Sequence, residues 1–186
     1  MECYISLFAE PKAKVRLMFM DEAGFGRISE PSYCWCPLGV RPVVPSHRVR
    51  EYLYAYGAVD PVNGDGYYIV TPNCNTVWTS KFLEVLSERF KDDYILLCTD
   101  NAGWHKSKSL KIPDNIRIHY LPAYTPELNP IEQVWKEVRK DDFKNTSFNT
   151  LKDVENHLAS SLMSLTKDTI KSVCGREWIV SMSIWN

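Results

Sequence analysis

The sequence predicts an α/β fold in which a mixed five-stranded sheet is flanked by helices. The first half of the chain alternates short apolar runs with turn residues, which is typical of antiparallel strands. The second half sets helical periodicities between further apolar runs, which favours right-handed crossovers and parallel pairing. The 186 residues, 45% of them hydrophobic, suffice for one well-filled core, so a single domain over residues 1–186 is expected.

Three antiparallel strands are expected first. Residues 15–20 form an apolar run that ends at Asp21 and a glycine-rich turn. Residues 33–45 suggest a further extended piece that prolines interrupt. Residues 51–60 alternate aromatic and small residues and predict a strand. The segment PVNGDG then predicts a hairpin that returns the chain as a strand over residues 67–72.

From Asn75 onward the pattern changes to helices that alternate with strands. Residues 94–98 and 116–122 are apolar enough for two further strands, which complete the sheet. Apolar positions recur at helical spacing in the remaining segments. The expected helices cover residues 75–90, 125–143, 149–165 and 167–174.

Composition and charge point to a cytoplasmic protein. The net charge of −1 argues mildly against a stand-alone nucleic-acid binder, but not against an enzyme whose carboxylates bind metal ions. The six cysteines are scattered, and Cys34 and Cys36 lack a second ligand pair, so no structural zinc is expected. Residues 1–16 lack the features of a signal peptide. No stretch approaches the roughly 18–20 apolar residues of a membrane span.

Two aspartates directly follow apolar runs. Asp21 follows residues 15–20, Asp100 follows residues 94–98, and each precedes a glycine. Turn formation alone would explain Asp100. If the two strands are adjacent and parallel, however, both carboxylates emerge at the same edge of the sheet, where ligands tend to bind. Two close anions repel unless cations lie between them, and all-oxygen ligands suit Mg²⁺ or Mn²⁺.

A third carboxylate is needed to hold two ions, and Glu132 is the candidate. Asn129 is a natural N-cap and Pro130 suits the first helical position, so Glu132 falls three residues after the cap. A capping box is therefore one explanation, and a pair with Lys136 is another. Glu132 also lies beside Trp135 at the border of the apolar face. On these grounds capping is the simpler interpretation, and metal binding stays open.

Three segments in this order carry a resemblance: FMDEAGFG, LLCTDNAGWHKS and IRIHYLPAYTPELNPIEQVWKEVRK. They resemble the catalytic core of the insertion-sequence transposases related to the Tc/mariner group, within the DDE transposase and integrase superfamily. The resemblance runs from about Val15 to Lys144. It implies a ribonuclease H-like fold and an acidic triad of Asp21, Asp100 and Glu132.

The resemblance also implies a reaction. The triad would hold two ions, Mg²⁺ or Mn²⁺, roughly 3.5–4 Å apart at the scissile phosphate. Water or a DNA 3′-hydroxyl would attack in line, without a serine or tyrosine nucleophile. The implied partner is DNA, both element ends and target, and a homodimer is expected in the active state, in a prokaryotic cytoplasm. Two alternatives stay open: a ribonuclease H-like nuclease with another substrate, and a catalytically silent relic acting as an interaction domain.

Several other residues are candidates for accessory roles. Asn101 lies near the metal site or starts the turn, and His105 approaches the phosphate or is a partly exposed helix-start histidine. Glu22 is expected on the opposite face of the strand, in a structural or solvent-facing role. A further group of residues is predicted to contact DNA. Each also has a non-functional explanation, namely a solvated surface charge for the basic residues and core or rim packing for the aromatic ones. The group consists of Arg41, Arg48, Arg50, Trp104, Tyr124, Lys136, Arg139 and Lys140.

The family usually carries helix-turn-helix domains ahead of the first catalytic strand. About twenty residues precede Asp21 here, too few for such domains, so a truncated copy or a fragment is expected. Weak DNA binding without strong sequence preference follows. Nanomolar, sequence-selective binding to a terminal repeat would refute that expectation.

Overall fold

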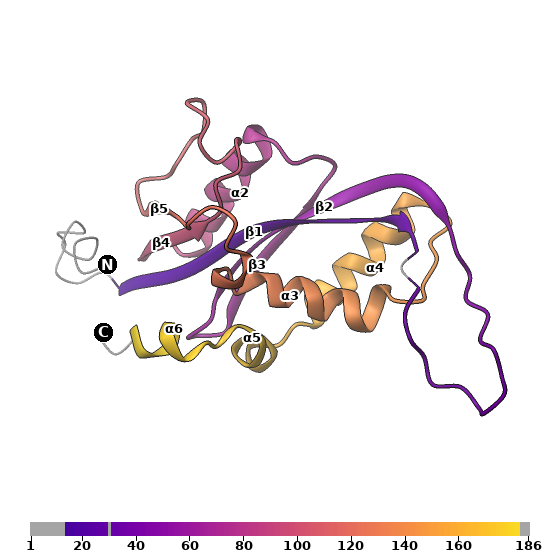
Figure 1. Cartoon of the computed structure of the whole chain (residues 1–186). Coiled ribbons are helices and arrows are strands. Elements are labelled where there is room, and N and C mark those ends of the chain that lie inside the picture. Colours follow the sequence, from indigo (N-terminus) through magenta and orange to yellow (C-terminus); the bar gives the residue numbers. More distant parts are fainter. Residues whose placement is uncertain (1–13, 30, 183–186) are drawn as a thin grey trace.

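A five-stranded mixed sheet between two layers of helices forms the protein, as the computed structural model shows for residues 14–29 and 31–182 (Figure 1). Most of the segment considered for a signal peptide lies outside these described residues. The strands are β1 (Lys14–Ile28), β2 (Arg48–Asp60), β3 (Asp65–Thr71), β4 (Asp93–Thr99) and β5 (Ile116–Tyr120). The helices are α2 (Thr76–Arg89), the short η1 (Pro126–Leu128), α3 (Ile131–Val138), η2 (Arg139–Phe143), α4 (Leu151–Ser164), α5 (Lys167–Cys174) and α6 (Glu177–Met182).

The strands lie in the order β3-β2-β1-β4-β5. β1 pairs with β2 and β2 with β3 in antiparallel fashion, while β4 runs parallel to β1 and β5 parallel to β4. This confirms the predicted ribonuclease H-like sheet. The pairing also confirms that the strands before Asp21 and Asp100 are neighbours and parallel.

Alternation along β1 divides the core between the two faces of the sheet. Met18 and Met20 face α2, whose buried side chains include Phe82 and Leu86. Phe19 belongs to the larger cluster built with α3, α4, α5 and α6. Successive side chains of a strand point to opposite faces, so residues next to each other at Asp21 serve different layers.

The predicted turn after Asp21 is wrong, because β1 continues to Ile28. Gly24 and Gly26 lie inside the strand, directly opposite Tyr54 and Tyr52 of β2. A side-chain carbon built on Gly26 would lie 2.5 Å from the Tyr52 ring. Gly26 therefore makes room for the Tyr52 ring of the neighbouring strand, and neither glycine turns the chain.

The predicted extended piece over residues 33–45 is also wrong. This segment belongs to a loop without strand pairing, which extends away from the sheet between β1 and β2 (Figure 1). Pro37, Pro42 and Pro45 lack the backbone N–H that a strand ladder needs. Loop formation follows from this loss of donors.

The helix predicted over residues 125–143 is divided into three parts. A short 3-10 turn, η1, comes first, then α3, and finally the π-helical turn η2. Asn129 ends η1, and no side chain caps the start of α3. The predicted capping box of Asn129 and Glu132 is therefore wrong, which leaves the Glu132 side chain available for other contacts.

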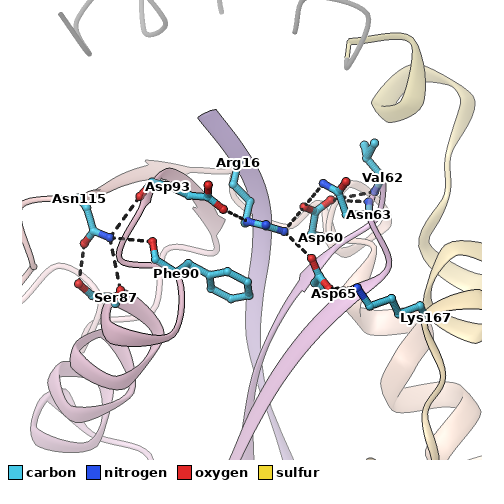
Figure 2. A network of polar contacts seen from close by, with 10 residues as sticks. All are labelled: Arg16, Asp60, Val62, Asn63, Asp65, Ser87, Phe90, Asp93, Asn115 and Lys167. Atoms are coloured by element: carbon cyan, nitrogen blue, oxygen red, sulfur yellow. Dashed lines mark hydrogen bonds and ion pairs between the residues drawn. The ribbon is translucent and has the colours of Figure 1, made fainter. Parts of the chain in front are cut away.

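Arg16 forms ion pairs with residues of three other strands at the end of the sheet where β1 and β4 begin (Figure 2). Its guanidinium lies 2.8 Å from Asp60, 2.6 Å from Asp65 and 2.7 Å from Asp93, oxygen atoms of three different strands. The same group lies over the Phe90 ring at 4.4 Å. Arg16 is 9% exposed, so these ion pairs are shielded from water and join β1 to β2, β3 and β4.

Among the described residues, none of the helices has the length and apolar character that crossing a membrane requires.

Candidate active site

The parallel pairing of β1 and β4 brings Asp21 and Asp100 together. Phe19 of β1 pairs with Cys98 of β4, and each aspartate stands two residues beyond this pair. β4 ends at Thr99, so Asp100 is the first residue of the following loop. Both side chains line one cleft at this edge of the sheet, the edge where ligands bind in sheets of this kind.

Glu132 lines the same cleft from α3. Two long-range hydrogen bonds place this helix on β1. The Asn129 amide donates to the carbonyl of Met20 at 3.0 Å, and the Trp135 indole N–H donates to Asp21 Oδ2 at 3.0 Å. Because these contacts flank Glu132 on both sides in sequence, they hold its backbone close to Asp21.

The Trp135 indole reaches Asp21 because β2 carries a glycine at this level. Gly57 pairs directly with Asp21 across the antiparallel ladder. A side-chain carbon built on Gly57 would lie 2.7 Å from the Trp135 ring and 2.9 Å from Ile131. Any larger residue would therefore push α3 away from the sheet and withdraw Glu132 from the aspartates.

The cleft has a volume of about 440 Å³ and combines acidic, amide and aromatic side chains. Its wall comes from the end of β4, the loop after β5 and the start of α3. The lining residues are Asp21, Asp100, Asn101, Ala102, Leu121, Pro122, Ala123, Tyr124, Thr125, Pro126, Asn129 and Glu132. The predicted triad thus shares a single concave surface.

Asp21 is the most perturbed acid of the cleft. Burial raises its pKa to about 7, with further contributions from the negative charges of Glu132 and Glu22, and the Trp135 hydrogen bond offsets only part of this rise. A carboxyl group in this situation gains from any cation placed beside it. The Asn129 side-chain oxygen is also buried in the wall, and none of the described residues forms a hydrogen bond with it.

Asp100 is held by a histidine. Its side chain is 55% exposed, and Oδ1 lies 2.9 Å from His105 Nδ1 and accepts the Ala102 N–H at 3.0 Å. The His105 bond is the main cause that lowers the pKa of Asp100. Burial opposes protonation of His105, but its bonds to Asp100 and Glu22 outweigh this effect and raise its pKa to about 9.

His105 is buried, contrary to the alternative of a partly exposed histidine. It is 1% exposed, and its Nε2 lies 2.9 Å from Glu22 Oε1. The Glu22 side chain is 5% exposed, on the face of β1 opposite Asp21, so of the two expected alternatives the solvent-facing one is wrong. Sequence reasoning missed the ion pair, because 83 positions separate its two members.

The three candidates Asn101, Trp104 and Tyr124 have different surroundings. The Asn101 amide donates to the Leu121 carbonyl at 2.6 Å, while Asp100 accepts the turn bond from Ala102, so Asp100 starts the turn. Trp104 is half-buried and packs edge-on against His105. Tyr124 is 101% exposed at φ 61°, so the packed alternative is wrong for its side chain.

The basic candidates lie on two regions outside the cleft. Arg41, Arg48 and Arg50 are exposed on the β1–β2 loop and the start of β2. On and after α3, Lys136 and Lys140 are exposed, whereas Arg139 donates to the carbonyl of Gly24 at 3.1 Å. Arg139 thereby docks the end of α3 on β1.

The donor set suits hard divalent cations. Asp21, Asp100 and Glu132 offer only carboxylate oxygens, the ligands that Mg²⁺ and Mn²⁺ prefer. Among residues 14–29 and 31–182, the side chains of His, Cys, Asp and Glu do not come together in any group of three or more that could hold a metal ion. The shared cleft and the raised pKa of Asp21 nevertheless fit a site for cations.

Comparison with known proteins identifies the family. A family model described as DDE superfamily endonuclease matches residues 16–155. The protein y4pE/y4sA of Sinorhizobium fredii is 35% identical over 130 residues, which cover 68% of this chain and 96% of that protein.

Solved structures of Mos1 share the fold. The Mos1 strand transfer complex matches with a TM-score of 0.65 at 15% identity, over 97% of this chain and 58% of that chain. The Mos1 mariner paired end complex with Mn matches with a TM-score of 0.65 at 15% identity, over 89% of this chain and 53% of that chain. The chain thus spans less than two thirds of the Mos1 chains, and at this identity the likeness concerns the fold. The family match shows that the chain belongs to the DDE superfamily of endonucleases.

Proposed function

We propose that this chain is the catalytic domain of a metal-dependent DNA transposase, which cuts and joins DNA phosphodiester bonds. One observation carries the proposal: Asp21, Asp100 and Glu132, from three separate elements, line the same cleft. Membership of the DDE superfamily supports it. We further propose that residues 1–186 act as one catalytic domain.

Asp21, Asp100 and Glu132 are the proposed ligands of two Mg²⁺ or Mn²⁺ ions. When bound, such ions supply activation of the attacking oxygen and stabilisation of the leaving oxygen in an in-line displacement. The three carboxylates supply the negative charge that binding of divalent cations requires. Asp21 contributes a carboxylate of raised pKa and Asp100 an exposed one, while α3 carries Glu132 against β1.

The proposed reaction needs no protein nucleophile. Water, or a DNA 3′-hydroxyl in the joining step, would attack the phosphodiester. The chain's own contribution is therefore to orient ligands and to position the scissile phosphate at the cleft. The Trp135 and His105 hydrogen bonds to the two aspartates serve the first of these tasks.

Tyr124 is the proposed contact to a DNA base. It lines the cleft, its ring is exposed, and its backbone has the left-handed conformation that costs a tyrosine energy. Aromatic side chains offer a stacking surface to any base. Trp104, half-buried beside His105, would support the same wall rather than stack.

The exposed basic residues are the proposed contacts to the phosphate backbone: Arg41, Arg48, Arg50, Lys136 and Lys140, with Arg139 contributing through the part that remains accessible. The related Mos1 structures are described as strand transfer and paired end complexes. We therefore propose DNA element ends and target DNA as partners, and a homodimer in the active state. The Sinorhizobium fredii relative supports a prokaryotic cytoplasm as the setting.

Cleavage and strand transfer assays test the proposal. Wild type, Asp100→Asn and Asp114→Asn, an exposed control, would be incubated with plasmid DNA, element-end duplexes and RNA–DNA hybrids in Mg²⁺, Mn²⁺ or EDTA. The expected result is metal-dependent nicking and joining of DNA by wild type and the control, with loss in Asp100→Asn.

Two other outcomes would replace the proposal. Cleavage of the hybrid alone would identify a ribonuclease H-like nuclease. Equal background activity in wild type and Asp100→Asn would identify a silent relic.

A further inference from the structure

The two aspartates of the cleft share one feature: in each, one carboxylate oxygen is engaged by a buried donor. Asp21 Oδ2 accepts the indole N–H of Trp135 at 3.0 Å. Asp100 Oδ1 lies 2.9 Å from Nδ1 of His105. Within the described residues, no side chain donates a hydrogen bond to the second oxygen of either aspartate. The backbone of Glu22 also bonds to the Asp21 carboxyl group, but no described side chain competes with a further ligand for the second oxygen of either aspartate.

Trp135 is a fixed donor. It is 1% exposed, and its ring packs edge-on against Phe25 and Tyr68 at centroid distances of 6.3 and 6.1 Å. Gly57 supplies the space beneath the ring. The indole cannot turn away without displacing this packing, so its N–H stays directed at Asp21.

His105 is fixed from the other face of the sheet. Its Nε2 lies 2.9 Å from Glu22 Oε1, and its Nδ1 also lies 3.1 Å from Thr99 Oγ1. Its backbone carbonyl accepts the Tyr120 hydroxyl at 2.7 Å. Each ring nitrogen of His105 thus lies within hydrogen-bond distance of a carboxylate oxygen. The contact with Glu22 thus fixes the orientation of the His105 ring and keeps its Nδ1 directed at Asp100.

We infer that Trp135 and His105 are positioning residues, which hold one oxygen of each aspartate and leave the other for a divalent cation. Glu22 acts through His105. The inference rests on the proposed function, because it concerns the same cations. Donors behind metal ligands change metal affinity by about 10–100-fold in well-studied sites.

A pair of histidine variants tests the role of His105. His105→Asn keeps an amide donor where Nδ1 stands, whereas His105→Gln keeps one where Nε2 stands. Mn²⁺ affinity would be measured by isothermal titration calorimetry on the folded chain. We expect His105→Gln to bind Mn²⁺ about 10–100-fold more weakly and His105→Asn to recover most of this loss. His47→Asn, which removes a half-buried imidazole bonded to Phe148 elsewhere, should leave the affinity unchanged.

Trp135→Phe tests the second donor, since it removes the N–H and keeps a ring. The control is Phe25→Leu, which loosens the same packing without touching a carboxylate. Trp135→Phe should weaken Mn²⁺ binding about tenfold or more, and Phe25→Leu should not. Thermal unfolding and near-ultraviolet circular dichroism report whether each variant folds.

The outcomes separate this inference from the proposed function. Tight Mn²⁺ binding by wild type, with equal affinity in His105→Gln and Trp135→Phe, overturns the inference alone. Equal weakening by Trp135→Phe and Phe25→Leu assigns the Trp135 effect to packing and overturns its role. Absence of Mn²⁺ binding in wild type removes the proposed function, and the inference with it.

Discussion

Asp21 and Asp100 stand at the same level of the sheet, each two residues beyond Phe19 and Cys98, which pair across the parallel strands β1 and β4. Glu132 approaches them from α3 in the same cleft. Burial raises the pKa of Asp21, and the negative charges of Glu132 and Glu22 raise it further, so this carboxylate is repelled by its neighbours in the absence of cations. Stability and metal binding therefore oppose each other at this site.

Asp21→Asn is expected to stabilise the cation-free protein. The substitution removes a buried charge near Glu132 while keeping the size of the side chain, so the free energy of unfolding should rise by about 1–2 kcal/mol at pH 8 in EDTA. Urea denaturation measures the change. The increase in melting temperature that Mn²⁺ gives to wild type should be absent in the variant. Asp92→Asn, an exposed control, should stay within about 0.5 kcal/mol of wild type. A cation-free variant less stable than wild type would contradict the repulsion.

Gly57→Ala should loosen the contact between α3 and β2. The new methyl group would lie within 3 Å of Trp135, Tyr68 and Ile131, so these side chains would have to shift. We expect a loss of about 1–3 kcal/mol in the free energy of unfolding, measured with urea. Gly103→Ala is the matched control, because nothing lies within 4 Å of the added carbon. Equal stability of the two variants would show that α3 is not held at Gly57.

Arg16→Met should be strongly destabilising. It leaves the carboxylates of Asp60, Asp65 and Asp93 near one another without their shared guanidinium. Breaking a buried ion pair from one side costs about 3–5 kcal/mol. Lys81→Met, which removes an exposed pair with Glu84, should leave the free energy of unfolding nearly unchanged. Chemical denaturation of the two variants compares them directly, and similar losses would contradict a buried network.

The Asp65 carboxylate makes part of the stability dependent on pH. Burial would raise its pKa, but the bonds from Lys167 and Arg16 prevail and lower it. A depressed carboxyl pKa contributes stability above the unfolded value of about 3.9, and this is lost as the pH falls through the lower folded value. Wild type should therefore exceed Asp65→Asn in stability at pH 6, with a difference that shrinks below about pH 4. Urea denaturation across this range checks the sign, and a difference that grows in acid would contradict it.

Tyr124→Gly should separate stability from DNA binding. Glycine adopts the φ of 61° without strain, so the loop should gain about 0.5–1 kcal/mol. Loss of the exposed ring should weaken binding to single-stranded DNA by about 1–3 kcal/mol, measured by fluorescence anisotropy. Tyr124→Phe keeps the stacking surface and serves as the control. Unchanged DNA affinity in Tyr124→Gly would exclude stacking at this position.

The residue pattern predicted the elements with strong periodicity. Local apolar spacing predicted the strands around Asp21 and Asp100 and the helices α2 and α5. The buried face of a single helix or strand is visible in the sequence because its residues recur at a fixed spacing. The pattern failed where local signals conflicted with pairing. Gly24 and Gly26 indicated a turn but lie in β1 opposite tyrosines. The capping signal at Asn129 also failed, since no side chain caps α3 and the Asn129 amide donates to the Met20 carbonyl instead.

The positions of the strands along the chain, and of an aspartate after each of two apolar runs, were already decided by the linear sequence, since apolar runs and turn residues act locally. The parallel pairing that makes those two strands neighbours depends on the folded chain. The folded chain alone decided which donors hold those aspartates and how Glu132 reaches them. Trp135, His105 and Glu22 act across contacts between residues far apart in sequence. Such contacts depend on strand register and helix docking, which the core sets as a whole and no local periodicity encodes.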